Sequence, residues 1–184
     1  MELIDRLFPR FDADGLELIN KAYIIASEAL KEHSRSNGKP FLEHPMAVAR
    51  IADEEIGLSA ECIAAVFLHE ATRFHPETDI SGFGQDVYTI VDGLNKISTI
   101  NPRDTRLEAE NYKRLIVSYS RDPRVTVLKI ADRLEVMRSL EIFPKASRER
   151  KVLETMMLYI PLAHQLGLYN IKSELEDIYF KYAD

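Results

Sequence analysis

The stretch Ala64–Glu70, which reads AAVFLHE, decides the fold of this 184-residue chain. Five apolar residues in a row lead into an imidazole and a carboxylate, His69 and Glu70. Ser59 precedes the stretch at a position where its hydroxyl can cap a helix. The pattern therefore predicts a buried helix that begins after Ser59 and ends in two side chains of the kind that bind divalent metals.

Helical spacing continues on both sides of this stretch. Before it, apolar residues recur with helical period over residues 16–30, a turn is predicted over 34–40, and His44-Pro45 starts a new helix with proline in its first turn. After it, a polar segment covers residues 98–104, and helices are predicted over residues 85–94, 108–120, 122–137, 147–166 and 170–182. Because no alternating strand pattern occurs, we predict an all-α fold and a single domain over residues 1–184.

Composition narrows the class of protein. Hydrophobic residues make up 46% and charged residues 29%, which are ordinary values for a globular domain. No apolar segment is long enough to span a membrane, the N-terminus lacks the pattern of a secretion signal, and Cys62 is the single cysteine. We therefore expect a cytoplasmic protein without a membrane partner. The net charge of −6 disfavours direct nucleic-acid binding.

Four residues are candidate ligands for one metal ion: His44, His69, Glu70 and Asp132. They would come from three different helices, an arrangement in which the core of a helical bundle holds the metal. In the alternative interpretation, His44 caps a helix, His69 is a buried structural histidine, and the two acids form salt bridges. Spacing alone leaves both open. His164, in apolar surroundings, is expected to be a core histidine.

Several ordered motifs resemble one family. Residues 37–45 (NGKPFLEHP) resemble its segment ending in His-Pro, and 67–70 (FLHE) stand where it has Phe-Leu-His-Asp. Residues 90–96 (IVDGLNK) are similar to Ile-Val-Asp-Gly-Val-Thr-Lys, and 128–134 (LKIADRL) to Val-Lys-Leu-Ala-Asp-Arg-Leu. With 159–167 (YIPLAHQLG) and 174–177 (ELED), these motifs make the chain resemble, from about residue 22 to 182, the N-terminal hydrolase domain of the RelA/SpoT family. That family synthesises and hydrolyses the alarmone (p)ppGpp.

The resemblance implies an all-helical HD bundle, the first domain of a longer protein with a C-terminal synthetase domain as its partner. It implies a metal, expected to be Mn²⁺, held by the residues matching His44, His69, Glu70 and Asp132. It also implies (p)ppGpp as the nucleotide, whose 3′-pyrophosphate the family removes to give GDP or GTP.

The sequence departs from the family pattern at the metal site. Glu70 replaces an aspartate and is one methylene longer, which matters where productive geometry tolerates only about 0.5 Å. The family next has a Glu-Asp pair, thought to position or activate the attacking water, where this chain has Arg73 and Phe74. Arginine cannot accept a proton. Arg73 has three open interpretations: it pairs with Glu70, it binds a phosphate, or it is a solvated surface residue.

The expected nucleotide pocket is altered as well. Residues 132–137 (DRLEVM) stand where the family has Asp-Arg-Leu-His-Asn-Met, so that Val136 replaces an asparagine. Ser36 stands where the family usually has lysine, which leaves Arg35 as the retained cation, and Ser139 replaces a threonine. Arg35, Asn37 and Ser139 are the candidate substrate-binding residues.

These changes favour a degenerate hydrolase domain, weak or inactive, that regulates an attached (p)ppGpp synthetase. Two alternatives remain open. One is an active, metal-dependent (p)ppGpp 3′-pyrophosphohydrolase. The other is a helical interaction domain without a ligand, whose sign would be an empty site with Glu70 or Asp132 paired to Arg73.

Overall fold

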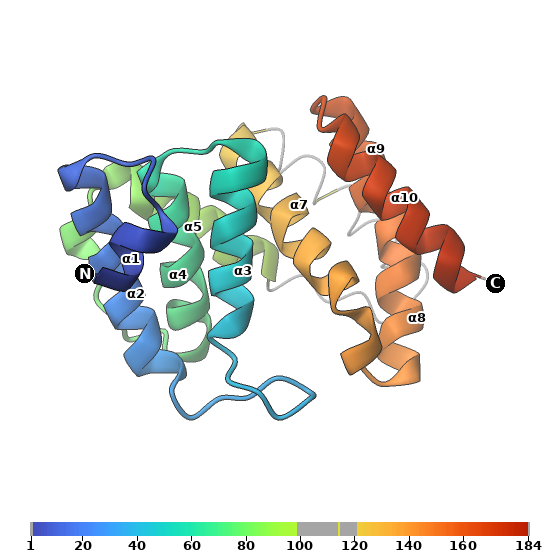
Figure 1. Ribbon diagram of the computed structural model, residues 1–184, viewed down its shortest axis with the longest axis horizontal. Coiled ribbons are helices and arrows are strands. Elements are labelled where there is room, and N and C mark those ends of the chain that lie inside the picture. Colours follow the sequence, from blue (N-terminus) through green and yellow to red (C-terminus); the bar gives the residue numbers. More distant parts are fainter. Residues whose placement is uncertain (1, 99–113, 115–120, 184) are drawn as a thin grey trace.

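The computed structural model describes residues 2–98, 114 and 121–183 (Figure 1). Within these residues the fold is helical, and the predicted all-α class is confirmed. The helices are α1 (Glu2–Leu7), α2 (Ala13–Leu30), α3 (Glu43–Ile51), α4 (Ala60–Phe74), α5 (Gln85–Ser98), α7 (Pro123–Arg138), α8 (Lys145–Glu154), α9 (Ile160–Gln165) and α10 (Tyr169–Ala183). Apart from Ser98 and Arg114, the predicted polar segment over 98–104 and the predicted helix over 108–120 lie outside the described residues.

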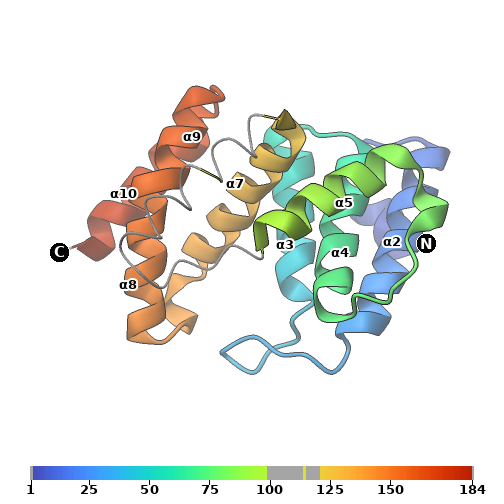
Figure 2. The ribbon, with the colours of Figure 1, turned by 180° about the vertical axis from the view of Figure 1, so that it is seen from behind.

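Helix α4 forms the centre of the fold, as its apolar run predicts. The side chain of Ser59 caps it by accepting a hydrogen bond from the amide of Cys62, and every residue from Cys62 to Thr72 is buried. Helices α2, α3, α5 and α7 all pack against it. A helix that is apolar all round requires such cover. Figure 2 shows α5 crossing α4 on the face opposite α1.

Helix α7 connects the two ends of the molecule. Asp122 accepts a hydrogen bond from the amide of Arg124, and Pro123 stands in the first turn, so the predicted cap and proline start are confirmed. The helix runs between the group formed by α2–α5 and the C-terminal helices α8–α10 (Figures 1 and 2). It contacts α3, α4, α5, α9 and α10. Residues on α7 can therefore face the end of α4.

Two helices contain single π-helical turns that sequence spacing does not indicate. Residues Ala52–Ile56 extend α3 in this form and end at Gly57, whose φ of 80° suits glycine. Residues Thr155–Tyr159 join α8 to α9, within the single helix predicted over 147–166. His164, near the C-terminal end of α9, is exposed and does not belong to the core. Its ring contacts the ring of Tyr169. The expectation for His164 was wrong.

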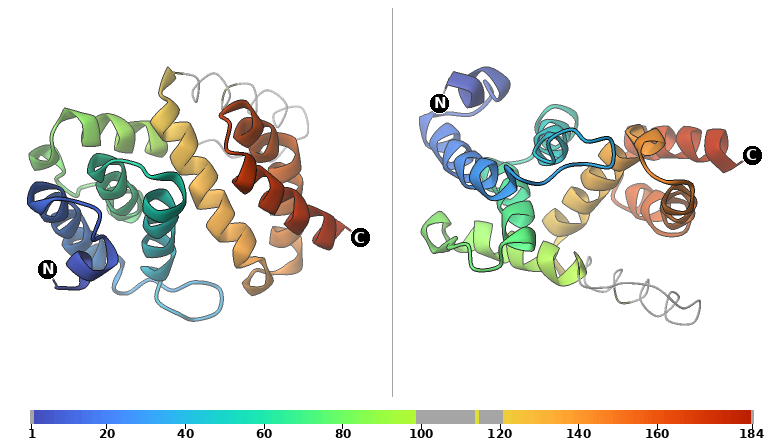
Figure 3. Two further views of the ribbon diagram at one scale, coloured as in Figure 1. Left: turned by 45° about the horizontal axis from the view of Figure 1, so that its top comes forward. Right: turned by 90° about the horizontal axis from the view of Figure 1, so that it is seen from below.

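The loop between α2 and α3 is folded back on itself. Ser34 and Pro40 form an isolated antiparallel bridge, the amide of Arg35 donates to the carbonyl of Lys39 at 2.8 Å, and Gly38 adopts a φ of 83° at the tip. The loop extends from the end of α2 toward α7 (Figure 3). It thereby places Arg35 beside α7.

No helix in the described part of the chain is long and apolar enough to cross a membrane.

Candidate metal centre

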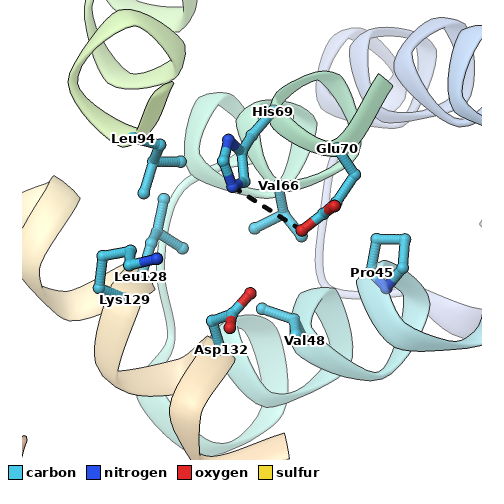
Figure 4. Close-up of a pocket in the computed structure, with 9 residues that line it drawn as sticks. All are labelled: Pro45, Val48, Val66, His69, Glu70, Leu94, Leu128, Lys129 and Asp132. Carbon is cyan, nitrogen blue, oxygen red and sulfur yellow. Dashed lines mark ion pairs between the residues drawn. The ribbon is translucent and has the colours of Figure 1, made fainter. Parts of the chain in front are cut away.

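Side chains from three helices converge where α3, α4 and α7 meet. One ligand atom each from His44, Glu70 and Asp132 lies within 4.8 Å of the others. Nε2 of His44 lies 3.0 Å from Oδ2 of Asp132 and 3.9 Å from Oε1 of Glu70. Nε2 of His69 lies 3.7 Å from the same Oε1 atom (Figure 4). The structure thus groups three of the four residues that the sequence singles out, and it places the fourth, His69, beside Glu70.

The group is buried on all sides but one. His44, His69 and Glu70 are buried, whereas the Asp132 side chain keeps 26% of its surface exposed. His69, Glu70 and Asp132 line a small cavity of about 10 Å³, room for roughly one water-sized particle. Apolar side chains form most of its wall: Pro45, Val48, Val66, Leu94 and Leu128. Solvent and ligands would therefore reach the group from the Asp132 side.

The donor set and spacing fit a divalent cation. Ligands bound at about 2.1 Å to one ion lie about 3 Å apart when adjacent and about 4.2 Å apart when opposite. The separations of 3.0 Å for His44–Asp132, 3.9 Å for His44–Glu70 and 3.7 Å for His69–Glu70 fall in that interval, and the group within 4.8 Å consists of His44, Glu70 and Asp132. Mixed imidazole and carboxylate donors suit Mn, Fe or Zn rather than Ca.

A chain of hydrogen bonds orients the His69 ring. The hydroxyl of Thr72 donates to the carbonyl of Leu68 and accepts from Nδ2 of Asn95 at 2.9 Å. This arrangement directs Oδ1 of Asn95 to Nδ1 of His69 at 2.8 Å. Because that oxygen only accepts, Nδ1 carries the proton and Nε2 keeps its lone pair toward the cavity. Burial also lowers the pKa of His69, which keeps the imidazole neutral.

His44 lies between two carboxylates. Its Nδ1 is 2.5 Å from Oε1 of Glu135, and its Nε2 is 3.0 Å from Oδ2 of Asp132. Burial alone would lower the pKa of His44, but the charge and hydrogen bond of Asp132, the hydrogen bond of Glu135 and the charge of Glu70 outweigh burial and raise it to about 10. Burial opposes ionisation of Asp132, yet the positive charge of His44 holds the pKa of that carboxyl well below its usual range.

Glu70 is shared between the cavity and Arg73. Both Nη2 and Nε of Arg73 donate to Oε2 of Glu70, at 2.7 and 3.0 Å, while Oε1 faces the histidines. The guanidinium carbon of Arg73 lies 4.5 Å from the centre of the Phe74 ring and 5.7 Å from that of Phe41. Of the three interpretations of Arg73, the structure shows the pairing with Glu70.

Two of the three candidate substrate-binding residues contact one buried carboxylate. Arg35 donates to both oxygens of Glu135, at 2.8 and 3.0 Å, and Ser139 donates to Oε2 of Glu135 at 2.8 Å. Asn37 lies on the exposed loop, where its side chain accepts a hydrogen bond from the amide of Lys39. The structure therefore places Arg35 and Ser139 close to His44 and leaves Asn37 apart. Their role in substrate binding stays a prediction.

Sequence reasoning missed three residues at this site: Asn95, Lys129 and Glu135. Figure 4 shows the amino group of Lys129 directed toward the space between His69 and Asp132. Lys129 and Glu135 stand three residues before and after Asp132 on α7, so helical spacing could have indicated that they share its face. Asn95 carried no such signal, because its partner His69 lies on another helix.

Comparisons with known proteins agree with this geometry. A family model described as an HD domain matches residues 22–169. The chain is 40% identical over 172 residues to the guanosine-3′,5′-bis(diphosphate) 3′-pyrophosphohydrolase of Aquifex aeolicus, which covers 90% of this chain and 24% of that protein. It is 36% identical over 184 residues to the bifunctional (p)ppGpp synthase/hydrolase SpoT of Escherichia coli, covering 98% and 26%. A GTP pyrophosphokinase of Streptomyces coelicolor is 35% identical over 175 residues, covering 94% and 20%. The chain spans about a quarter of the length of the first two relatives.

Proposed function

We propose that this chain is an HD domain that retains a metal site and has lost most or all hydrolysis. The chain belongs to the HD-domain family and is homologous to the N-terminal region of the RelA/SpoT (p)ppGpp synthetases and hydrolases. The observation that carries the loss of hydrolysis is the ion pair between Arg73 and Glu70, which is also part of the sign expected for the third alternative, a helical interaction domain without a ligand. The ion pair puts a guanidinium beside the candidate metal ligands, at a position where the family is expected to have a carboxylate.

Retention of the metal site is supported by the donor set. His44, His69, Glu70 and Asp132 would hold the ion, and we expect Mn²⁺ by resemblance to the family. When bound, a divalent ion lowers the pKa of a water and offsets phosphate charge. The hydrogen bond from Nδ1 of His69 to Asn95 directs Nε2 of His69 at the cavity. The bond of His44 Nδ1 to Glu135 leaves Nε2 of His44 facing Asp132 and Glu70. These supports favour metal binding whether or not hydrolysis survives.

Loss of hydrolysis is supported by what surrounds Arg73. General-base catalysis requires an acceptor within hydrogen-bond reach of the attacking water. Arg73 only donates, and Phe74 packs against the rings of His33 and Phe41, with centroids 4.3 and 5.1 Å away. Neither side chain can take a proton from water, so the step that the family's acidic pair is thought to assist has no counterpart at these positions.

Weak nucleotide binding is supported by two residues of the expected nucleotide pocket, Arg35 and Val136. The donors of Arg35 are engaged by Glu135, and only 9% of the Arg35 side chain is exposed. A phosphate would have to compete with that double ion pair. Val136, in place of the family's asparagine, offers no hydrogen bond to a base or sugar. We therefore propose that the domain binds (p)ppGpp weakly.

The hydrolytic half of the proposal is tested by pyrophosphate release from ppGpp in the presence of Mn²⁺. The wild-type protein is compared with the triple variant Glu70→Asp, Arg73→Glu, Phe74→Asp, which restores the family's residues. We expect little or no release by the wild type and a gain in the triple variant. Robust turnover by the wild type would instead establish the alternative, an active 3′-pyrophosphohydrolase, which the preserved ligand set favours.

The regulatory half concerns longer proteins that carry this domain. Because the relatives are about four to five times as long and one of them is named a GTP pyrophosphokinase, we propose that the domain controls a synthetase domain in the same polypeptide. Deletion of residues 1–184 from such a protein is expected to change its rate of (p)ppGpp synthesis. An unchanged rate would remove this role and leave the interpretation of the metal site intact.

A further inference from the structure

The carboxylate of Glu135 lies directly behind the candidate metal ligand His44. Glu135 is buried, with 6% of its surface exposed, and it stands where the family has histidine in the stretch Asp-Arg-Leu-His-Asn-Met. Its Oε1 atom is 2.5 Å from Nδ1 of His44, the ring nitrogen that faces away from Glu70. Sequence reasoning assigned no role to this residue.

Three neighbouring residues donate hydrogen bonds to this carboxylate. Oε1 accepts from His44 and from Nη2 of Arg35, and Oε2 accepts from Nη1 of Arg35 and from the hydroxyl of Ser139. The guanidinium of Arg35 also sets a positive charge beside this buried carboxylate. A carboxylate held by four donors has one position and cannot rotate toward the metal itself.

We propose that Glu135 is a positioning residue for the metal site. By accepting from Nδ1–H, it fixes the tautomer and the orientation of His44, so that Nε2 presents its lone pair to the ion beside Asp132. A carboxylate behind a ligand histidine also raises the basicity of the ring. Arg35 neutralises the buried charge and locks the carboxylate in place, which makes it part of the support for His44.

A purely structural role is the competing explanation. In that case the Arg35–Glu135 pair anchors the loop over residues 33–41 on α7, and the bond to His44 is incidental. The two roles make different predictions, because a structural anchor affects the stability of the fold without changing metal affinity. The inference rests on the metal site of the proposed function and does not depend on whether hydrolysis is lost.

The test is Mn²⁺ affinity, measured by calorimetry on folded variants. Glu135→Leu removes the acceptor and is expected to weaken binding about 10- to 100-fold. Glu135→Gln keeps a carbonyl oxygen for Nδ1–H, loses the charge, and is expected to fall between the wild type and Glu135→Leu. Arg35→Gln leaves the bond to His44 in place and is expected to weaken binding less than Glu135→Leu does.

The matched control is Glu154→Gln, which breaks another largely buried ion pair of α7, with Arg133, at 3.1 Å. It is expected to lower stability and to leave Mn²⁺ affinity unchanged. A second readout is the Nδ1–H proton of His44 in NMR spectra of isotope-labelled protein. We expect this signal in the wild type and in Arg35→Gln, and its loss in Glu135→Leu. If Glu135→Leu does not fold, Glu135→Gln still carries the affinity test.

Two results would overturn the inference, and they can be told apart. Wild-type binding with unchanged affinity in both Glu135 variants would leave the metal site standing and reduce Glu135 to a structural anchor. Absence of Mn²⁺ binding by the wild type would remove the metal site of the proposed function and the role of Glu135 with it.

Discussion

The two oxygens of Glu70 have different partners, and this division determines what the site can do. Oε1 lies 3.7 and 3.9 Å from the two histidines, and Oε2 is held by Arg73. An aspartate, one methylene shorter, would hold its oxygens nearer the backbone of α4 and farther from the end of Arg73. The longer side chain therefore makes the ion pair possible while keeping one oxygen at the cavity.

Removal of Arg73 is expected to lower stability and raise metal affinity. In Arg73→Ala, the buried Oε2 of Glu70 loses its partner, which costs about 1–3 kcal/mol of unfolding free energy in the metal-free protein. The same change frees both oxygens for a cation, so Mn²⁺ should bind more tightly. Thermal unfolding and calorimetry measure the two effects.

The control for Arg73→Ala is Arg50→Ala. Arg50 pairs with Glu54 on the surface of the molecule, and both side chains are at least one-third exposed. An exposed pair of this kind contributes below about 1 kcal/mol. Equal losses of stability in the two variants would show that the Arg73–Glu70 pair contributes no more than a surface contact.

Metal affinity is expected to rise with pH because of His44. Its pKa of about 10 means that, without a metal, the ring keeps its second proton throughout the neutral range. A cation can bind Nε2 only after displacing that proton, whereas Asp132 is already ionised. One proton released per ion corresponds to about a tenfold gain in Mn²⁺ affinity per pH unit.

Calorimetry in buffers of different ionisation enthalpy measures this proton release directly. The prediction holds from mildly acidic to mildly alkaline solution, below the pKa of His44. A Mn²⁺ affinity that does not change with pH in that range would show that His44 does not bind the ion through Nε2.

The candidate metal ligands could be proposed from residue type and motif, whereas the residues that hydrogen-bond to them could not. His44, His69, Glu70 and Asp132 have the chemistry of metal ligands wherever they stand in the chain. The hydrogen bonds between Asn95 and His69 and between Glu135 and His44 depend on how each helix is rotated about its axis. A small error in that rotation would move the paired atoms out of hydrogen-bonding distance. One-dimensional spacing does not contain that rotation.

At the scale of elements, the helices with explicit start signals were predicted well. Ser59 and Asp122-Pro123 start α4 and α7 as expected, because a cap or a first-turn proline acts locally. The π-helical turns over Ala52–Ile56 and Thr155–Tyr159 insert one residue into a helix. Such an insertion is determined by packing against other helices, so the sequence pattern did not indicate it.

The contact between α5 and α7 depends on a glycine. A Cβ atom on Gly93 would lie 2.7 Å from Cγ2 of Val125, a buried and rotationally restricted side chain. We expect Gly93→Ala to destabilise the fold by about 1–3 kcal/mol through overpacking. Gly82→Ala is the control, because a Cβ atom on Gly82 would meet none of the described atoms within 4 Å and the backbone there has no positive φ.

A double-mutant cycle separates this overpacking from the general effects of each substitution. Val125→Ala removes the methyl that meets the added Cβ, so Gly93→Ala should cost less in a Val125→Ala background than in the wild type. Equal costs in the two backgrounds, measured by denaturant unfolding, would contradict the proposed contact between α5 and α7.

At the scale of the molecule, the site exists only because distant segments fold together. Its residues come from α3, α4 and α7, so the separations among them could not be derived from local pattern. The sequence could indicate this convergence only through resemblance to a family. The same convergence means that an ion held by the four residues would connect α7 to α3 and α4.

A bound cation is therefore expected to stabilise the whole fold. At about 100 times its Kd, Mn²⁺ would contribute about 2.7 kcal/mol to unfolding free energy. For a chain of this length, that corresponds to a rise in Tm of roughly 5–11 °C. Chelation should reverse the rise, and Asp132→Asn should abolish it. A Tm that is insensitive to Mn²⁺ in the wild type would argue against a site shared by α3, α4 and α7.

The most direct test of the central claim is the rate of pyrophosphate release from ppGpp by the wild-type protein saturated with Mn²⁺. The claim is that the ligand set persists while Arg73 and Phe74 have replaced the groups that assist the attacking water. It predicts release no faster than in an Asp132→Asn variant that lacks a ligand. Wild-type turnover well above that variant would contradict the claim and establish the domain as a working hydrolase.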